Sequence, residues 1–499
     1  MRRNYKYTQF ALLSSFLLFV YIYGLKYANA FIVNNAVGKR LLHLSDVNFI
    51  INNNRNNEDG SWISFTRLRM TSSIPEQANN DNKRTTTLNA ATGITLPSTL
   101  LVDDTNRSDA ISNSGVGVLF LNLGGPKTGD DVEEFLYNLF KDPDIIRLPG
   151  PLSPLQNLIA SFIAKRRAPK SRAAYESIGG GSPILEYTNA QADLLTKSLQ
   201  KRHDLAVKTY VGMRYWKPFT EDALESIRKD KLKALVIVPL YPQFSISTSG
   251  SSLRVLQEEF SKDTTSFGDM IHTVVPSWYY RPGYITAVSS LIQTELDSFT
   301  ESEIAQANKD VPDITPLHIL FSAHGVPKSY IEAGDPYQQQ MEKCVEAITA
   351  KLYETNSPKN LTIHLSYQSR VGPIEWLRPY TDDVLPELGE SGVDNLVVVP
   401  ISFVSEHIET LEEIDMEYRE LAEESGVTNW RRCPAPNTDP TFIADMADMV
   451  YEALMEPAQT VTETCIANNI EGLDLETLDD SGAVESMLPD EYISTRKQR

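Results

Sequence analysis

The chain is poor in cysteine and in basic residues, and both shortages exclude kinds of protein. Only three of its 499 residues are cysteines (Cys344, Cys433 and Cys465), widely spaced and with no CxxC pair. Neither a disulfide framework nor a cysteine-bound zinc or iron–sulfur site is therefore indicated. Lys and Arg number 46 against 66 Asp and Glu, and the formal net charge is −20. Nucleic-acid binding is not expected, because it needs a basic face; a cationic substrate fits better.

A nucleotide-binding fingerprint is also lacking. The glycines at 115 and 117 precede an apolar run, whereas a dinucleotide fingerprint follows a strand. The glycine run at 179–181 has no strand before it, and no Walker lysine is present. Neither run predicts a bound nucleotide.

The two ends of the chain do not have the pattern of a packed fold. Residues 1–30 are typical of a signal peptide, with basic residues first, then the apolar run 10–25 and then the small residues Ala28-Asn29-Ala30. A permanent transmembrane helix is the weaker interpretation, because the run is shorter than the ~20 residues that span a bilayer. Residues 31–115 begin with Phe31, are rich in Asn, Ser and Thr, and resemble the transit part of the bipartite presequences of algae with complex plastids. We expect plastid import; secretion with a disordered leader is the alternative. The acidic residues 456–499 predict a flexible tail.

Between these ends, short apolar runs alternate with helical patterns. Strands are expected at 117–121, 208–213, 235–239, 318–322, 361–365 and 396–399, and helices at 130–140, 284–296 and 441–454. Continuous apolar strands between helices indicate an α/β fold with parallel sheets covered on both faces.

The folded region also contains an internal repeat. GVLFLNLGGP at 117–126 parallels HILFSAHGVP at 318–327, and LVIVPLYPQFS at 235–245 parallels LVVVPISFVSE at 396–406. The two pairs occur in the same order. They predict two similar doubly wound, Rossmann-like lobes, 116–300 and 301–455, with an active-site cleft between them. Chance convergence of buried strands is the alternative.

Titratable side chains follow two strands of the second lobe. His324 comes just after the strand at 318–322, while His407 and Glu409 follow the strand at 396–399. In open α/β sheets, ligands bind at the carboxyl ends of strands. An imidazole and a carboxylate there suit a divalent metal such as ferrous iron or base catalysis. A lone loop histidine is, however, more often structural.

A row of carboxylates leads away from this point. Glu409, Glu413 and Glu417 recur every four residues, so they share one helical face. Such a row could carry cations inward or protons outward. The alternative is a solvated surface helix.

Aromatic and arginine side chains gather in the connecting segments. The aromatic ones are Tyr175, Tyr215, Trp216, Tyr241, Trp278, Tyr367, Trp376 and Phe403. Any one of them is most simply a core residue, but together they could line a pocket for a large flat ligand. Arg166, Arg167 and Arg214 could meet the carboxylates of that ligand.

Six long motifs closely resemble those of ferrochelatases, most of all the cyanobacterial and plastid branch. They are LNLGGP, AKRRAPKSRAAYESIGGGSPI, LYPQFSISTSGSS, FSAHGVPKSYIEAGDPY, LSYQSRVGPIEWLRPYTD and VPISFVSEHIETLEEIDMEY. The resemblance covers essentially all of 116–454. It implies a lyase that inserts ferrous iron into protoporphyrin IX, releases two protons and forms protohaem in the terminal step of haem synthesis.

The resemblance also implies roles for individual residues. His324 and Glu409 match the family's iron-binding or proton-accepting pair, with the division between them open, and His407 matches a neighbouring histidine. The positions that match the macrocycle pocket are Leu123, Arg167, Tyr175, Tyr215, Trp376 and Phe403. Leu123 stands where some members have methionine. Glu406 also matches an acidic family position. Glu413 and Glu417 extend the acidic line from the site, and we interpret all three as an iron or proton path.

Two departures from the family change what is expected. Ile246 occupies the position of one cysteine that binds an iron–sulfur cluster in animal members, and Cys465 stands alone in the tail. We expect no cluster and no permanently bound cofactor, with Fe²⁺ only as a substrate. Many cyanobacterial and plant members end in a chlorophyll-binding-like helix, and no such helix is expected after 454. Peripheral association with plastid membranes is expected instead.

Metal selectivity and oligomeric state stay open. The rival functions are a chelatase for another metal or tetrapyrrole and a porphyrin or haem carrier.

Overall fold

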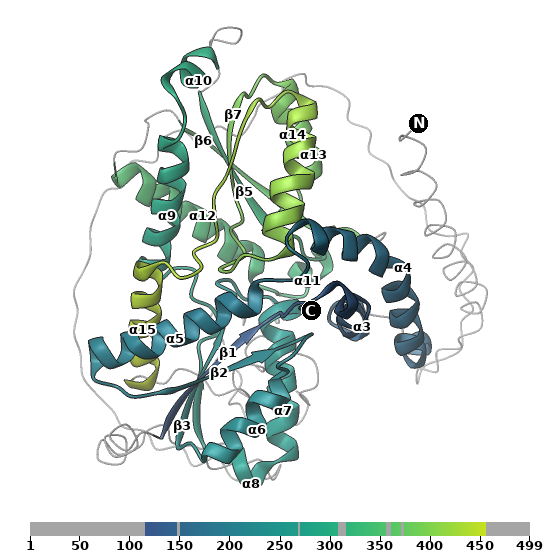
Figure 1. Ribbon diagram of the computed structural model, residues 1–499, viewed down its shortest axis with the longest axis vertical. Coiled ribbons are helices and arrows are strands. Elements are labelled where there is room, and N and C mark those ends of the chain that lie inside the picture. The colour runs from purple at the N-terminus through teal and green to yellow at the C-terminus, as the bar shows by residue number, and fades with distance from the viewer. Residues whose placement is uncertain are drawn as a thin grey trace, which may run out of the picture. The chain divides into compact units, whose positions relative to one another are not determined.

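The computed structural model describes residues 115–146, 150–267, 270–307, 316–355, 361–370 and 374–455 (Figure 1). The predicted signal peptide, transit segment and acidic tail lie outside these residues, as does Cys465. Within the described part of the chain, no helix is long and apolar enough to cross a membrane.

The described residues form two four-stranded sheets in which every pairing is parallel. The first sheet has the order β2-β1-β3-β4 and contains β1 (Val116–Asn122), β2 (Lys208–Met213), β3 (Ala234–Pro239) and β4 (Ile271–Val274). The second has the order β6-β5-β7-β8 and contains β5 (Leu317–His324), β6 (Leu361–Gln368), β7 (Asn395–Val399) and β8 (Asn429–Arg432). The predicted parallel α/β architecture is confirmed.

The two sheets have the same strand order and the same central register. Gly117 of β1 lies opposite Leu235 of β3, and His318 of β5 lies opposite Leu396 of β7. These are the residues that the internal repeat aligns. Strands β1, β3 and β7 are buried along their whole length, as expected for sheets covered on both faces. The chain is therefore built from two lobes of one design.

The helices cover the sheets (Figure 1). Those up to the end of the first sheet are α3 (Val132–Lys141), α4 (Gln156–Ser177), α5 (Ile184–His203), α6 (Thr220–Asp230), α7 (Ser251–Lys262) and α8 (Thr264–Phe267). The later ones are α9 (Pro282–Asp297), α10 (Glu301–Gln306), α11 (Lys328–Glu332), α12 (Tyr337–Glu354), α13 (Thr381–Glu390), α14 (Arg419–Ser425) and α15 (Pro440–Met455). Two short 3₁₀ segments, η1 (Gly129–Asp131) and η2 (Gly150–Leu155), precede α3 and α4.

Two helices pack outside the lobe in which the sequence places them. Helix α9, predicted within 116–300, packs against α12 and α15, and α15, predicted within 301–455, packs against α5 and contacts β3 and β4. One continuous cluster of buried apolar residues runs through both lobes as a result. This shared core holds the two lobes together along one side of the cleft.

The third strand of each lobe leads into a π-helix, η3 (Ile246–Gly250) after β3 and η4 (Glu409–Tyr418) after β7. Pro239 is the last residue of β3, and Pro400 directly follows β7. Proline suits a strand end because it cannot donate to the ladder. The helix predicted to carry the carboxylate row therefore starts as ten residues of π-helix. Such i→i+5 turns are rare and often mark functional sites.

Candidate active site

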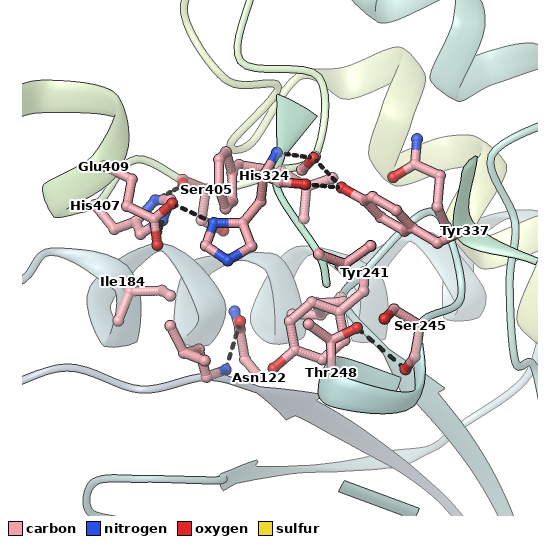
Figure 2. A pocket seen from close by; sticks show the side chains of 17 residues that line it. Asn122, Ile184, Tyr241, Ser245, Thr248, His324, Tyr337, Ser405, His407 and Glu409 are labelled. Atoms are coloured by element: carbon pink, nitrogen blue, oxygen red, sulfur yellow. Dashed lines mark hydrogen bonds and ion pairs between the residues drawn. The ribbon is translucent and has the colours of Figure 1, made fainter. Parts of the chain in front are cut away.

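The carboxyl ends of β1, β3, β5 and β7 face one pocket between the two lobes (Figure 2). Its open space, which is continuous with solvent, is about 670 Å³. Its walls come from Asn122, Leu123, Ile184, Leu240, Tyr241, Gln243, Ser245 and Thr248 of the first lobe and from His324, Val326, Tyr337, Ser402, Phe403, Val404, Ser405, His407 and Glu409 of the second. The cleft predicted from the sequence is present, and it places His324, His407 and Glu409 together.

His324 and Glu409 are in direct contact. The Nδ1 atom of His324 lies 2.9 Å from Oε2 of Glu409. Burial alone would lower the pKa of His324, but the Glu409 carboxylate raises it above its ordinary value. Burial alone would likewise raise the pKa of Glu409, but attraction to His324 lowers it. The contact therefore favours the imidazolium–carboxylate form, in which a proton must leave His324 before this imidazole can accept one or bind a cation.

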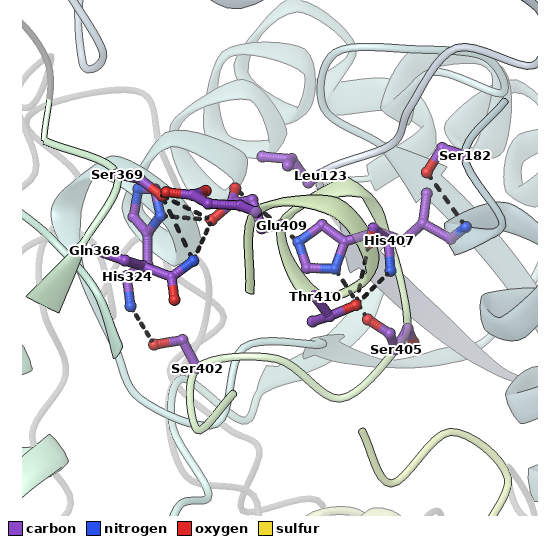
Figure 3. Close-up of polar contacts among 12 residues, drawn as sticks. Leu123, Ser182, His324, Gln368, Ser369, Ser402, Ser405, His407, Glu409 and Thr410 are labelled. Carbon is purple, nitrogen blue, oxygen red and sulfur yellow. Dashed lines mark hydrogen bonds and ion pairs between the residues drawn. The ribbon is translucent and has the colours of Figure 1, made fainter. Parts of the chain in front are cut away.

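His407 lies on the other side of Glu409 and stays neutral. Burial lowers its pKa, and its Nδ1 lies 3.1 Å from the carbonyl oxygen of Ser405 (Figure 3). Nδ1 is thus the protonated nitrogen, and the lone pair is on Nε2. That atom is 4.0 Å from Oε1 of Glu409. Two acceptors facing each other at this distance favour a cation or a shared proton between them.

Glu413 continues the carboxylate row, and Ser369 connects it to Glu409. The Ser369 hydroxyl lies 2.7 and 2.9 Å from the two Glu413 oxygens and 3.4 Å from Oε2 of Glu409. Burial and then repulsion from Glu409 raise the pKa of Glu413 to about 7. Near neutral pH this carboxyl can therefore both hold and release a proton beside the His324–Glu409 pair.

The other two acidic residues of the predicted path have different surroundings. Glu417 is 47% exposed and lies 3.1 Å from Nζ of Lys170 on α4, across the cleft. Glu406 is buried and accepts hydrogen bonds from Arg432 at 2.9 Å and from the Ala435 backbone at 3.0 Å. The structure thus joins Glu409 to Glu413, places Glu417 at the surface, and gives Glu406 structural partners. Its place on an ion path stays a prediction without support from these contacts.

The predicted macrocycle contacts fall into three groups. Phe403 lines the pocket, and its ring meets those of His407 and His324 edge-on at 4.4 and 6.2 Å between centroids. Leu123 also lines it. The side chain of Arg167 on α4 is exposed, and its guanidinium lies over the Phe140 ring, 5.6 Å from the ring centroid. Desolvation lowers the pKa of Arg167, while the Glu413 carboxylate raises it.

The four remaining residues predicted to bind the substrate make other contacts. Tyr175 and Tyr215 belong to a buried apolar cluster between α3 and α4. The Tyr215 hydroxyl donates to Asp142 at 2.8 Å, and Arg214 forms an ion pair with the same carboxylate at 2.6 Å. Trp376 packs close to Gly325, the residue after His324. Of the eight aromatic residues that the sequence singles out, only Tyr241 and Phe403 line the pocket.

Sequence reasoning missed several polar residues of the site: Asn122, Ser369, Gln368, Tyr337 and Ser402. Gln368 ends β6 and lies 3.4 Å from Glu409, and Ser369 follows it with a positive φ of 63°. The signal that could have found these two is their place after the strand at 361–365. Asn122 and Ser402 carry the same signal, because they follow the strands expected at 117–121 and 396–399. Tyr337, the first residue of α12, follows no strand directly and carries no such signal.

The site can therefore hold a cation and move protons at the same place. Among the described residues, no group of three or more His, Cys, Asp or Glu side chains is arranged as a metal site. A cation here would instead have an incomplete set of ligands, Glu409 with His324 or Glu409 with His407. Weak, partial ligation suits a metal that must be passed on.

Comparison with known proteins gives one family. The family model described as ferrochelatase matches residues 115–454. Ferrochelatase-1, chloroplastic/mitochondrial, of Arabidopsis thaliana is 55% identical over 350 residues, which cover 70% of this chain and 72% of that protein. Ferrochelatase-2, chloroplastic, of indica rice is 56% identical over 345 residues, covering 69% of this chain and 62% of the rice protein. The ferrochelatase of Synechocystis sp. is 54% identical over 346 residues, which cover 69% of this chain and 84% of the Synechocystis protein.

A solved structure is similar at a greater distance. The sirohydrochlorin chelatase SirB of Bacillus subtilis, in complex with cobalt, is 12% identical with a TM-score of 0.36, over 68% of this chain and 96% of that one. A likeness this remote adds nothing to the strand order and register described above.

Proposed function

The chain belongs to the ferrochelatase family, and from that premise we propose that its cleft inserts ferrous iron into protoporphyrin IX to form protohaem. The observation that carries this proposal is the His324–Glu409 contact of 2.9 Å inside a pocket shared by two lobes. A histidine and a carboxylate in contact there can both accept protons and hold a borderline divalent cation.

The reaction exchanges one Fe²⁺ for the two N–H protons of the macrocycle, so atoms and charge balance only if both protons leave. The neutral His407 and the carboxylate of Glu409 can take protons directly, while His324 can do so once its own proton has gone to solvent. Glu413, with its raised pKa, is one Ser369 hydroxyl away and can pass a proton onward.

The test is an anaerobic assay of the protein from residue 115 onward with ferrous iron and protoporphyrin IX, read as the haem spectrum. We expect catalytic turnover. Binding of protoporphyrin without turnover would favour the porphyrin or haem carrier. Turnover only with cobalt, nickel or another tetrapyrrole would favour a chelatase of different selectivity.

We further propose that residues 1–115 direct import into a plastid as a signal peptide followed by a transit segment. The plant relatives above are named chloroplastic or chloroplastic/mitochondrial, which supports a plastid but not the bipartite route. The test is a fluorescent protein fused after residue 115 and expressed in an alga with complex plastids. Plastid fluorescence is expected, with retention in the endoplasmic reticulum after deletion of residues 31–115. Secretion of the full fusion would refute the proposal.

We propose as well that no iron–sulfur cluster is bound. Ile246 begins η3, and Cys344 and Cys433 are buried, with burial raising the pKa of the Cys344 thiol to about 12. A thiol held protonated is a poor cluster ligand. Acid-labile sulfide in stoichiometric amount, in material purified anaerobically, would contradict this.

Peripheral membrane association is the last proposal on location. Helix α4 exposes Leu158 and Phe162 by 68% and 57%. Large apolar side chains exposed together are common where a protein meets a membrane surface. The test is flotation with vesicles of plastid lipids, in which the Leu158→Ser/Phe162→Ser variant should bind less than the parent. Equal flotation of both proteins would rule out this face.

A further inference from the structure

The catalytic histidine stands where β5 has lost one of its two neighbours. On one side β5 pairs with β6 as far as His324 opposite Gln368, but on the other it pairs with β7 only as far as Phe321 opposite Val399. Pro400 follows the last paired residue, and beyond it the Ile401 N–H still donates to the Ser322 carbonyl at 3.3 Å. In a parallel sheet, successive residues bond to alternate neighbours. Because the N–H of Gly325 bonds to Gln368, the N–H and C=O of His324 point to the side that β7 has left.

Two hydroxyl side chains take the place of the missing strand. The Oγ of Ser402 accepts from the backbone N–H of His324 at 2.9 Å (Figure 3), and the hydroxyl of Tyr337 donates to the His324 carbonyl at 2.8 Å (Figure 2). The two hydroxyls are 2.8 Å apart. Since Tyr337 has only one proton, Ser402 must be the donor between them. The result is a closed ring of three hydrogen bonds, here called the His324 clasp.

The clasp is buried and linked to the first lobe. Tyr337 is 5% exposed and Ser402 9%. Asp335, itself 4% exposed, accepts from the Tyr337 backbone N–H at 2.9 Å. Its other oxygen accepts from the Ser245 hydroxyl at 2.9 Å and the Ile246 N–H at 2.8 Å, at the start of η3. The residue that holds the His324 carbonyl is therefore anchored across the cleft.

We propose that Tyr337 and Ser402 are positioning residues that hold the His324 imidazole against Glu409 during metal insertion, with Asp335 tying them to the first lobe. This rests on the proposed function. Fixing both backbone polar groups of His324 fixes the direction of its Cα–Cβ bond, and with it the ring. A strand end held on one side only would leave the ring free to shift, and a displacement of about 1 Å can cost a hundredfold in rate.

The first test is kinetic. Tyr337→Phe and Ser402→Ala should each lower kcat by about tenfold or more, as the loss of supporting hydrogen bonds typically does, while the KM for protoporphyrin stays within about twofold. Ser402→Thr keeps the hydroxyl and should restore most of the rate. The double variant should lose little more than the worse single one, because one break opens the ring.

The matched control is Tyr330→Phe. The Tyr330 hydroxyl donates to the Asp144 carbonyl at 2.8 Å, so it also joins the two lobes and is not one of the residues of the clasp. Its removal should leave kcat within about twofold of the parent. A loss in Tyr330→Phe equal to that in Tyr337→Phe would show a general effect of lobe contacts and would overturn the proposal.

The second test does not depend on turnover. In protein with ¹³C-labelled histidine, the Cε1 signal of His324 is identified by its absence in His324→Ala. At one fixed pH it should shift or broaden in Tyr337→Phe and Ser402→Ala and stay in place in Ser402→Thr and Tyr330→Phe. An unchanged signal in the first two variants overturns the proposal. A parent protein that shows this pattern without inserting iron would refute the proposed function and retain the clasp.

Discussion

The two lobes present different side chains at equivalent places. Leu123 lies six residues after Gly117, and His324 six residues after His318, the two positions that the sheet registers align. Thr248 and Glu409 each lie nine residues after the proline at the end of the third strand, Pro239 in β3 and Pro400 directly after β7. All four side chains line the pocket. The shared fold supplies the positions, and only the second lobe fills them with groups that bind protons and metals.

The lobes also differ in how their charges are balanced. In the first lobe, Asp142 and Asp144 are matched by Arg214 and Arg254 in a buried network. In the second, the carboxylates of Glu409 and Glu413 crowd together with His324. A network in which each carboxylate is paired with an arginine stabilises the fold. A cluster with more negative than positive charge shifts the pKa values of its members, and such shifts are common at active sites. The predictions below test this contrast, from the largest expected effect to the smallest.

The largest effect is expected for His324→Ala. It removes the imidazole from the strand end that faces Glu409, and iron insertion should fall by about 10²-fold or more, the range of a lost acid–base group. Protoporphyrin binding, followed by fluorescence, and thermal stability should persist. The equivalent first-lobe change, Leu123→Ala, should raise the KM for protoporphyrin and keep kcat within about threefold. Near-normal turnover in folded His324→Ala would remove this residue from the mechanism.

Glu409→Gln should come close to His324→Ala. It preserves shape and hydrogen bonding but loses the charge that holds His324 protonated and the capacity to take a proton, so turnover should fall by about 10²-fold. Thr248→Val, at the matching place in the first lobe, should retain most of the activity. If the two changes were equally harmful, the contrast between the lobes would be wrong.

Glu413→Gln should have an intermediate effect on kinetics. If the carboxylate row conducts iron or protons, it should lower turnover or raise the apparent KM for iron, with little change in that for protoporphyrin. Initial rates at varied iron and fixed porphyrin measure this. If the row is only a like-charged helix face, iron kinetics should not change.

The same Glu413→Gln variant should show a pH-dependent gain in stability. The pKa of Glu413 is raised from 4.5 to about 7 in the folded protein, so the folded state binds more protons than the unfolded state between these values. Stability from this residue is therefore present below pH 4.5 and lost as the pH rises to 7. The variant escapes that loss. Its Tm relative to the parent should be higher at pH 8 than at pH 5, by about 1–3 °C. An equal difference at both pH values would contradict the raised pKa.

The smallest effect is expected for Glu417→Gln. Its ion pair with Lys170 is exposed on both sides, and such pairs contribute about 0–1 kcal/mol and weaken with salt. On the conducting hypothesis, the apparent KM for iron should rise less than in Glu413→Gln. Glu420→Gln, exposed on α14, is the control. Unchanged iron kinetics in a Glu413→Gln/Glu417→Gln double variant, with equal or higher Tm, would favour a solvated face.

The sequence by itself determined the repeated sheet design and the placement of the His324–Glu409 pair. Buried parallel strands need continuous apolar runs, so the six expected strands could be predicted from the sequence. Strands β4 and β8 could not be predicted, because they are only four residues long. Because ligands gather at strand ends, His324 and Glu409 could be brought together before any geometry was known.

Only the tertiary structure decided what each polar side chain contacts. Arg214 pairs with Asp142, 72 residues away, and Glu406 with Arg432, 26 residues away, and no local pattern encodes either partner. The π-helix could not be predicted from the sequence either. A four-residue spacing places carboxylates on nearly one face in both an α-helix and a π-helix. The His324 clasp exists only because β7 ends before β5 does. Local sequence specifies how a segment folds, whereas hydrogen bonds between distant segments depend on how those segments pack.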